Sequence, residues 1–256
     1  MNGEIQQASG IVISARRSLY KNEDIDFIPD KHVLSIQFVF APRLFHRRIT
    51  AGSVSDWFNI CLQRGLKDIK FVLPSNRAEK HLLGFANTSQ CAIICFWEKG
   101  RISGFYPTWE FGAEKAGWTI RYLEQSMAQD TMLDNLHFTD RTDEFKRILL
   151  DIGRFAKEIE QPYFSDVFHA AYMSLCDTGT IDDANVPQQL SRDLRAIYFA
   201  VDKADVFGAM GSWNDSPSWY AEEKGLEREY NELSNQLLDQ LRYHLMYVTN
   251  ECWNRN

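Results

Sequence analysis

The residues best suited to chemistry in this 256-residue chain lie between Asp202 and Asp215, where the sequence reads DKADVFGAMGSWND. Asp202 and Asp205 are three residues apart, so they would share one face of a helix, and Asp215 would lie in the loop that follows. Three converging carboxylates could hold a divalent cation, which prefers oxygen ligands. They could equally divide the roles of general acid and general base.

A structural interpretation of the same segment competes with this one, and we favour it. Glycines that follow a helix commonly cap it, Asn and Asp close turns, and Ser216-Pro217 is typical of a helix start. Two tryptophans would then cover the end of a helical bundle. We expect no cofactor and no metal, and we retain six candidate binding residues: Asp202, Asp205, Trp213, Asn214, Asp215 and Trp219.

The stretch from Asp205 to Asp215 resembles the C-terminal signature of uncharacterised bacterial proteins, some of which are encoded beside toxin genes. The likeness extends over about residues 198–250. It implies a bacterial origin and a role in protein interaction, and it brings no established activity and no catalytic residues.

A second candidate is the basic run PRLFHRR, which follows a predicted strand. Its side chains could hold a phosphate or stack on a base, and ligands gather at the carboxyl ends of strands in open α/β sheets. No glycine-rich phosphate loop accompanies the run. An exposed basic turn that pairs with acidic residues explains it equally well. The alternative phosphate-binding residues are Arg43, His46, Arg47 and Arg48.

Other catalytic patterns are missing from the sequence. It contains no G-x-S-x-G and no H-E-x-x-H motif, and its six histidines are dispersed. His169 and His244 fall near helical apolar stripes and are interpreted as core or boundary residues. The five cysteines are odd in number and scattered. We therefore expect mostly buried free thiols in a reducing cytosol, with Cys91 and Cys95 packed rather than metal-bound.

The elements that must position these residues differ between the two halves of the chain. Residues 1–135 show short apolar runs divided by turns, which predict strands over 33–40, 69–73, 91–97, 101–106 and 117–123. The turn at 98–100 has the length of a hairpin connection. Helical spacing predicts a helix over 53–66 and a shorter one over 77–86. This half is expected to form a mixed sheet with helices.

Residues 136–256 change to the helical period. Apolar stripes at 145–159, 167–175, 190–204 and 226–248 predict about four amphipathic helices. The expected fold class is therefore α+β, with a mixed α/β sheet region over 1–135 and an acidic helical region over 136–256, which could form one compact unit. The last helix is long enough to pair with a second copy of the chain.

Charge follows the same division. The net charge is −7, and it separates into +2 for residues 1–135 and −9 for residues 136–256. Such a balance disfavours nucleic-acid binding, which requires clustered cations. No apolar run has the length of about 18 residues that a bilayer requires, and the first residues lack a secretory pattern, so a cytoplasmic location without membrane attachment is expected. The acidic helices provide solubility or meet a basic partner.

Two functions follow as expectations. The first is a cytosolic bacterial binding protein, resembling an immunity protein or antitoxin, that blocks a protein partner with a basic surface. The alternative is a small metal-assisted hydrolase or phosphate-handling enzyme whose site lies between the two halves, where Arg43, Arg47 and Arg48 would face the loop 205–215. We lean toward the non-enzymatic function because the catalytic patterns are missing.

Overall fold

The computed structural model describes residues 1, 3–42, 49–73, 91–112, 116–127, 136–177, 181, 183, 185–208 and 210–253. Contacts between residues divide the chain into two compact units. The sheet unit contains the described residues within 3–73, 91–138 and 249–253, and the helical unit contains Met1 and those within 139–248. The α+β fold class predicted from the sequence is confirmed. The predicted helix over 77–86 lies outside the described residues.

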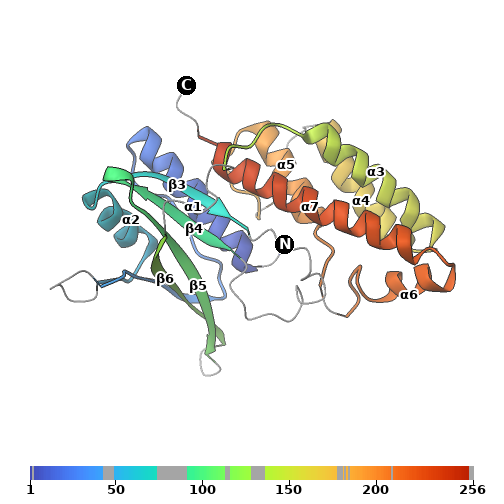
Figure 1. Ribbon diagram of the computed structural model, residues 1–256, viewed down its shortest axis with the longest axis horizontal. Helices are drawn as coiled ribbons and strands as arrows, with labels where there is room; N and C mark the ends of the chain where they lie inside the picture. The colour runs from blue at the N-terminus through green and yellow to red at the C-terminus, as the bar shows by residue number, and fades with distance from the viewer. Residues whose placement is uncertain are drawn as a thin grey trace. The chain divides into compact units, whose positions relative to one another are not determined.

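The sheet unit is built on a six-stranded mixed sheet with the order β2-β1-β6-β5-β4-β3 (Figure 1). β1 pairs in parallel with β6, and the other neighbouring strands are antiparallel. The predicted hairpin turn is the 3-10 turn η2 (Glu98–Gly100), in which Lys99 and Gly100 have φ angles of 62° and 70°. The strands are β1 (Val33–Val39), β2 (Thr50–Ala51), β3 (Leu66–Val72), β4 (Ala92–Trp97), β5 (Ile102–Gly112) and β6 (Gly117–Met127).

An aromatic cluster forms the centre of the sheet unit. Phe38 of β1 stacks on Tyr122 of β6 and on Trp57 of α2 (Val54–Gln63), with ring centroids 4.7 and 4.4 Å apart. Phe105 of β5 meets the ring of Phe38 edge to face at 5.8 Å. α2 begins where the sequence indicates, because the Ser53 hydroxyl accepts a hydrogen bond from the Asp56 amide at 3.0 Å. These rings bury a large apolar area.

The helical unit contains α3 (Thr142–Glu158), α4 (Pro162–Cys176), α5 (Arg192–Ala204), α6 (Ser216–Glu223) and most of α7 (Glu227–Glu251). The four predicted stripes correspond to α3, α4, α5 and α7, and the short helix α6 begins at Ser216, where the sequence indicates a helix start. The stripe of α3 is buried at Phe145, Ile148, Leu149 and Ile152. The stripe of α7 is also buried, at Leu237, Leu241, Leu245 and Val248, so these side chains are already covered by the chain itself.

The sequence did not predict the first helix, α1 (Gly3–Lys21). Its apolar positions alternate with polar ones that are also buried, among them Gln7, Ser9 and Arg16. A helix buried on several sides shows no clear polar face, and its apolar period is therefore weak. Nowhere in the described part of the chain does a helix combine the length and apolarity needed to cross a bilayer.

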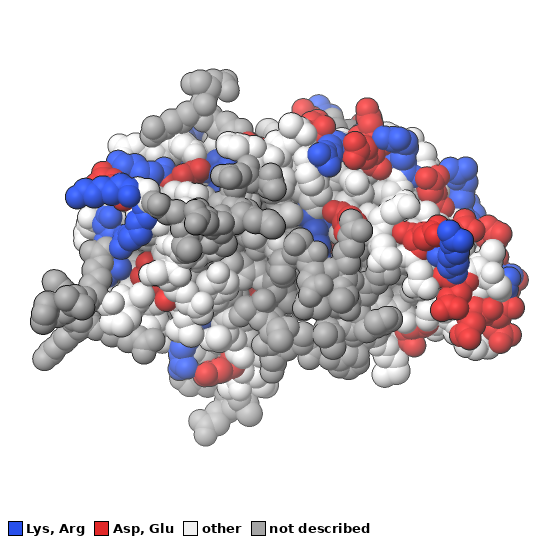
Figure 2. All heavy atoms as spheres, viewed as in Figure 1, with Lys and Arg blue, Asp and Glu red and all other residues white. Residues whose placement is uncertain are grey.

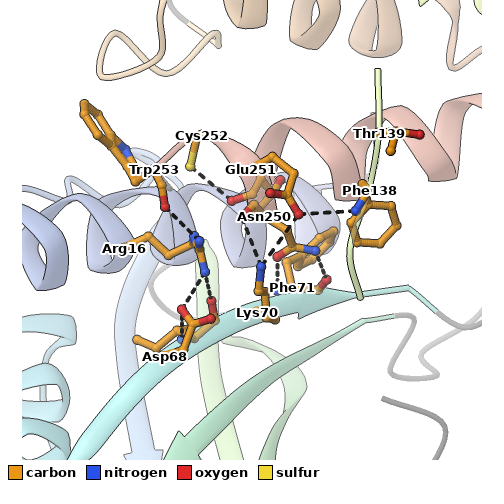
Figure 3. A network of polar contacts seen from close by, with 12 residues as sticks. Arg16, Asp68, Lys70, Phe71, Phe138, Thr139, Asn250, Glu251, Cys252 and Trp253 are labelled. Atoms are coloured by element: carbon orange, nitrogen blue, oxygen red, sulfur yellow. Dashed lines mark hydrogen bonds and ion pairs between the residues drawn. The ribbon is translucent and has the colours of Figure 1, made fainter. Parts of the chain in front are cut away.

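A buried polar network covers the outer edge of β3 (Figure 3). The Arg16 guanidinium donates to Asp68 Oδ1 at 2.6 Å, to the Ile69 carbonyl at 2.7 Å and to the Trp253 carbonyl at 2.9 Å. The Asn250 side-chain amide pairs with the backbone of Phe71, accepting from its N–H at 2.7 Å and donating to its carbonyl at 2.8 Å. Asn250 thus occupies the hydrogen bonds that a neighbouring strand would make. We call these contacts the edge network.

The edge network also contains Lys70, whose ammonium group lies 3.3 Å from the Asn250 carbonyl and 3.8 Å from Glu251 Oε1. Burial lowers the pKa of Lys70, and the nearby Arg16 cation lowers it further, whereas Glu251 acts in the opposite direction. An edge strand left open is a site for unwanted pairing with other chains. The edge network therefore completes the sheet with side chains from α1 and from the C-terminal residues.

Candidate protein-docking surface

Asp202 and Asp205 lie at the end of α5, and the structure brings them together as the sequence suggests. The amino nitrogen of Met1 is 2.9 Å from Asp202 Oδ1 and 3.9 Å from Asp205 Oδ2. Burial raises the pKa of Asp205, and the neighbouring Asp202 carboxylate raises it further. The Met1 amino group and the Phe207 backbone lower it. Both carboxylates therefore take part in contacts within the helical unit.

Asp215 has a different role from the other two aspartates. Its Oδ2 accepts a hydrogen bond from the Gly211 amide at 2.7 Å and closes the turn that precedes α6. Gly211 has a φ of 81°, which suits glycine. Among the described residues, no three carboxylate, imidazole or thiol side chains gather closely enough to hold a metal ion. The structure therefore shows a turn at Asp215 and an ion-paired couple at Asp202 and Asp205.

Trp213 is completely buried in the helical unit. Its indole N–H donates to the Ser234 hydroxyl at 2.8 Å, and its ring stacks on Tyr230 with centroids 5.5 Å apart. The Tyr230 hydroxyl donates in turn to the Trp213 carbonyl at 2.7 Å. Asn214 Nδ2 donates to the Gly208 carbonyl at 3.4 Å. Trp213 therefore attaches the loop to α7, whereas the Asn214 side chain bonds within the loop.

Trp219, unlike Trp213, reaches the surface, as Asp215 does. Its side chain on α6 is 54% exposed, and its ring meets the edge of Tyr220 with centroids 4.9 Å apart. Tyr163, at the start of α4, is 70% exposed. The candidate residues Arg43, His46, Arg47 and Arg48 lie outside the described residues.

Exposed carboxylates lie at the end of α3, the end of α6 and the start of α7, and those of α6 are one helical turn from Trp219. The salt bridge between Lys224 Nζ and Glu160 Oε1, 2.8 Å long, joins the first of these places to the turn between the other two. Figure 2 shows the acidic side chains in red over the place where Figure 1 has α6 and the start of α7. We call this surface the acidic end, and its carboxylates are Glu158, Glu160, Glu222, Glu223, Glu227 and Glu229.

The C-terminal ends of α3 and α6 add to the negative potential of this surface, whereas the N-terminus of α7 offsets part of it. A helix C-terminus carries a partial negative charge that favours cations, and both α3 and α6 end here. Nevertheless Glu222 and Glu223 occupy the last turn of α6, which contains no basic residue. Each carboxylate is therefore placed where the helix dipole opposes it. Such a departure from local preference is common where a protein binds something else.

Local ion pairs neutralise only part of the acidic end. Lys224 lowers the pKa of Glu160 by hydrogen bonding to its carboxylate, and Arg228 pairs with Glu232 at 2.8 Å. Within the described part of the chain, no ion pair involves Glu222, Glu223, Glu227 or Glu229. The remaining negative charge faces solvent and can attract a cationic partner over several ångströms.

A groove of about 630 Å³ lies elsewhere in the helical unit, between the first turns of α3 and α5. Its floor is apolar at Leu175 and Ile197, and its rim carries both acidic and basic side chains. One rim residue, Asp140, already caps α3 by accepting hydrogen bonds from the Thr142 amide at 2.8 Å and hydroxyl at 2.6 Å. The mixed charge of this groove selects no class of ligand.

Trp219 was a candidate from the sequence, whereas the carboxylates beside it were not. The sequence spacing could have identified them. Glu222 and Glu223 follow Trp219 by three and four residues, and this spacing places side chains on one face of a helix. Comparison of the chain with protein-family models, with curated proteins and with solved structures gave no match.

Proposed function

We propose that this chain is a cytosolic bacterial binding protein that uses its acidic end to dock a protein with a basic surface, in the manner of an immunity protein or antitoxin. The observation that carries the proposal is the position of Trp219, a half-exposed indole one helical turn from Glu222 and Glu223, which have no ion pair within the described residues. Buried free thiols at Cys61, Cys91 and Cys95 support a reducing compartment.

Each component of the surface has a defined part in binding. Residues 139–248, which include the acidic end, contain 20 acidic and 11 basic residues and have a net charge of −9. Complementary charge accelerates the encounter with a basic partner and gives it orientation. Affinity would come from the exposed rings, because aromatic side chains near the centre of an interface contribute most of its binding energy.

Affinity capture from a bacterial lysate, with variants of this chain as bait, tests the proposal. The acidic-end variant is Glu222→Lys, Glu223→Lys and Glu229→Lys together. The matched control, Glu144→Lys with Asp151→Lys and Asp177→Lys, makes the same change in charge at exposed sites elsewhere in the helical unit. We expect a basic protein that wild type and control capture and that the acidic-end variant loses.

The captured protein is then purified and its affinity is measured by calorimetry at several salt concentrations. We expect the affinity to fall as salt rises, since ions screen exposed charges. Equal capture by the acidic-end variant and the control would contradict the proposal. An affinity that does not change with salt would contradict it as well.

A further inference from the structure

We propose that α6 binds the guanidinium group of an arginine side chain, with Trp219 beneath the guanidinium plane and Glu222 and Glu223 accepting its hydrogen bonds. This inference rests on the proposed function and names the chemistry that the basic partner presents. It predicts that an arginine-rich segment binds better than a lysine-rich segment of the same charge.

The spacing on α6 supplies the arrangement. Trp219 is followed by carboxylates at the third and fourth positions, and these positions lie on the same face of a helix as the first. All three side chains are exposed, the indole by 54%. A flat ring with two neighbouring carboxylates matches the shape and charge of a guanidinium group.

Several other aromatic rings of this protein are covered by a cationic side chain of the same chain. A guanidinium carbon lies 4.1 Å from the ring centroid of Phe40, 4.6 Å from that of Trp97, 4.5 Å from that of Tyr243 and 5.0 Å from that of Tyr20. The ring of Trp253 is covered by the Lys21 ammonium at 4.7 Å. In the part of the chain that the structure describes, no such cation contacts Trp219.

The two carboxylates likewise remain available to a ligand. Glu160 of the acidic end and Glu232 of α7 each bind a cation of this chain at 2.8 Å. Glu222 and Glu223 have no such ion pair among the described residues, and the end of α6 adds its partial negative charge to theirs. A bound guanidinium group would neutralise the carboxylates of Glu222 and Glu223, which the negative end of the α6 dipole destabilises.

The chemistry separates arginine from lysine. A guanidinium group is planar, stacks on aromatic rings and presents its N–H groups in a fork that fits a carboxylate. An ammonium group is a compact, strongly hydrated charge that gains less from a ring. An exposed cation–π contact changes affinity by about threefold to fivefold. This is the size of the preference that we expect.

Fluorescence anisotropy with two labelled peptides, each of twelve residues and composed of arginine or of lysine, tests the inference on the full chain at physiological salt. We expect wild type to bind the arginine peptide about threefold to fivefold more tightly than the lysine peptide. Trp219→Ala should reduce the affinity for the arginine peptide to that for the lysine peptide. Glu222→Gln with Glu223→Gln should weaken the binding of both peptides.

Phe111→Ala is the matched control, because Phe111 is 56% exposed and lies in the sheet unit. It should leave both affinities unchanged, and a thermal unfolding curve should verify that each variant is folded. Equal affinity of wild type for the two peptides would overturn the inference.

If wild type binds the two peptides equally and the glutamine substitutions weaken the binding of both, the proposed basic partner stands while the arginine preference falls. If Trp219→Ala and the glutamine substitutions leave both affinities unchanged, the inference and the proposed docking surface fall together.

Discussion

The edge network and the acidic end differ in the burial and pairing of their charged groups. In the edge network, Arg16 and Lys70 are buried, and hydrogen bonds from within the sheet unit surround their cationic groups. At the acidic end, carboxylates and an indole face solvent, and several have no partner among the described residues. A buried charge without partners is costly, whereas an exposed one is hydrated by water. The difference indicates that the edge network serves stability and that the acidic end is available for binding.

The largest effect on stability is expected from Arg16→Met, which would leave two backbone carbonyls without this donor and Asp68 without its cation, although the Tyr20 hydroxyl and the Ile69 amide would still donate to Asp68. Removing one partner of a buried ion pair costs about 3–5 kcal/mol, and the partial exposure of Asp68 favours the lower value. Urea unfolding followed by circular dichroism measures the change.

The neighbouring Arg17→Met is the control for this substitution. Arg17 is partly exposed and pairs with Glu23 at 3.1 Å, so its loss should change stability by less than about 1 kcal/mol. Equal losses in the free energy of unfolding would show that the edge network stabilises the fold no more than an exposed ion pair does.

Two tryptophans six residues apart sharpen the comparison. Trp213→Phe keeps a buried ring but removes the hydrogen bond to Ser234, so we expect a loss of about 1–2 kcal/mol in the free energy of unfolding and unchanged partner binding. Trp219→Ala should do the reverse, with little change in stability and a clear loss of affinity. A Trp213 variant that folds normally but fails to bind would contradict this division of roles.

A smaller effect is expected from the pH dependence of stability. Burial lowers the pKa of His244 below its usual value of 6.5. The unfolded chain therefore binds more protons than the folded chain below about pH 6.5, so this contribution is complete above that pH and is lost as the pH falls toward the folded-state pKa. We expect wild type to lose stability faster than His244→Phe between pH 7 and pH 5.5 in urea unfolding series. Parallel pH curves for the two proteins would contradict the assignment.

Regular periods made the helices of the C-terminal half predictable from sequence, because each apolar stripe of α3, α4, α5 and α7 becomes a buried face. α1 was not predicted, since Gln7, Ser9 and Arg16 occupy buried positions that a one-sided pattern excludes. Only long-range contacts, such as that of Arg16 with Trp253, explain why polar residues are stable there.

The candidate site was predictable only in part. Trp213 and Trp219 lie close together in the sequence, and nothing in the sequence indicates which of the two side chains is exposed. The structure separates them because Tyr230 and Ser234 of α7 bury the first. Convergence of Asp202, Asp205 and Asp215 was the less favoured of two interpretations of the sequence. In the structure, Gly211 donates a hydrogen bond to Asp215, and the Met1 amino group pairs with Asp202 and Asp205.

Zero-length carbodiimide cross-linking, which joins carboxylates to amines in direct contact, is the most direct test of the acidic end. It would be applied to the chain with its captured basic partner, and the linked peptides would be identified by mass spectrometry. We predict links from Glu222, Glu223, Glu227 or Glu229 to lysines of the partner, lost at high salt. Links confined to carboxylates elsewhere, such as Glu110 of β5 or Asp151 of α3, would contradict the account.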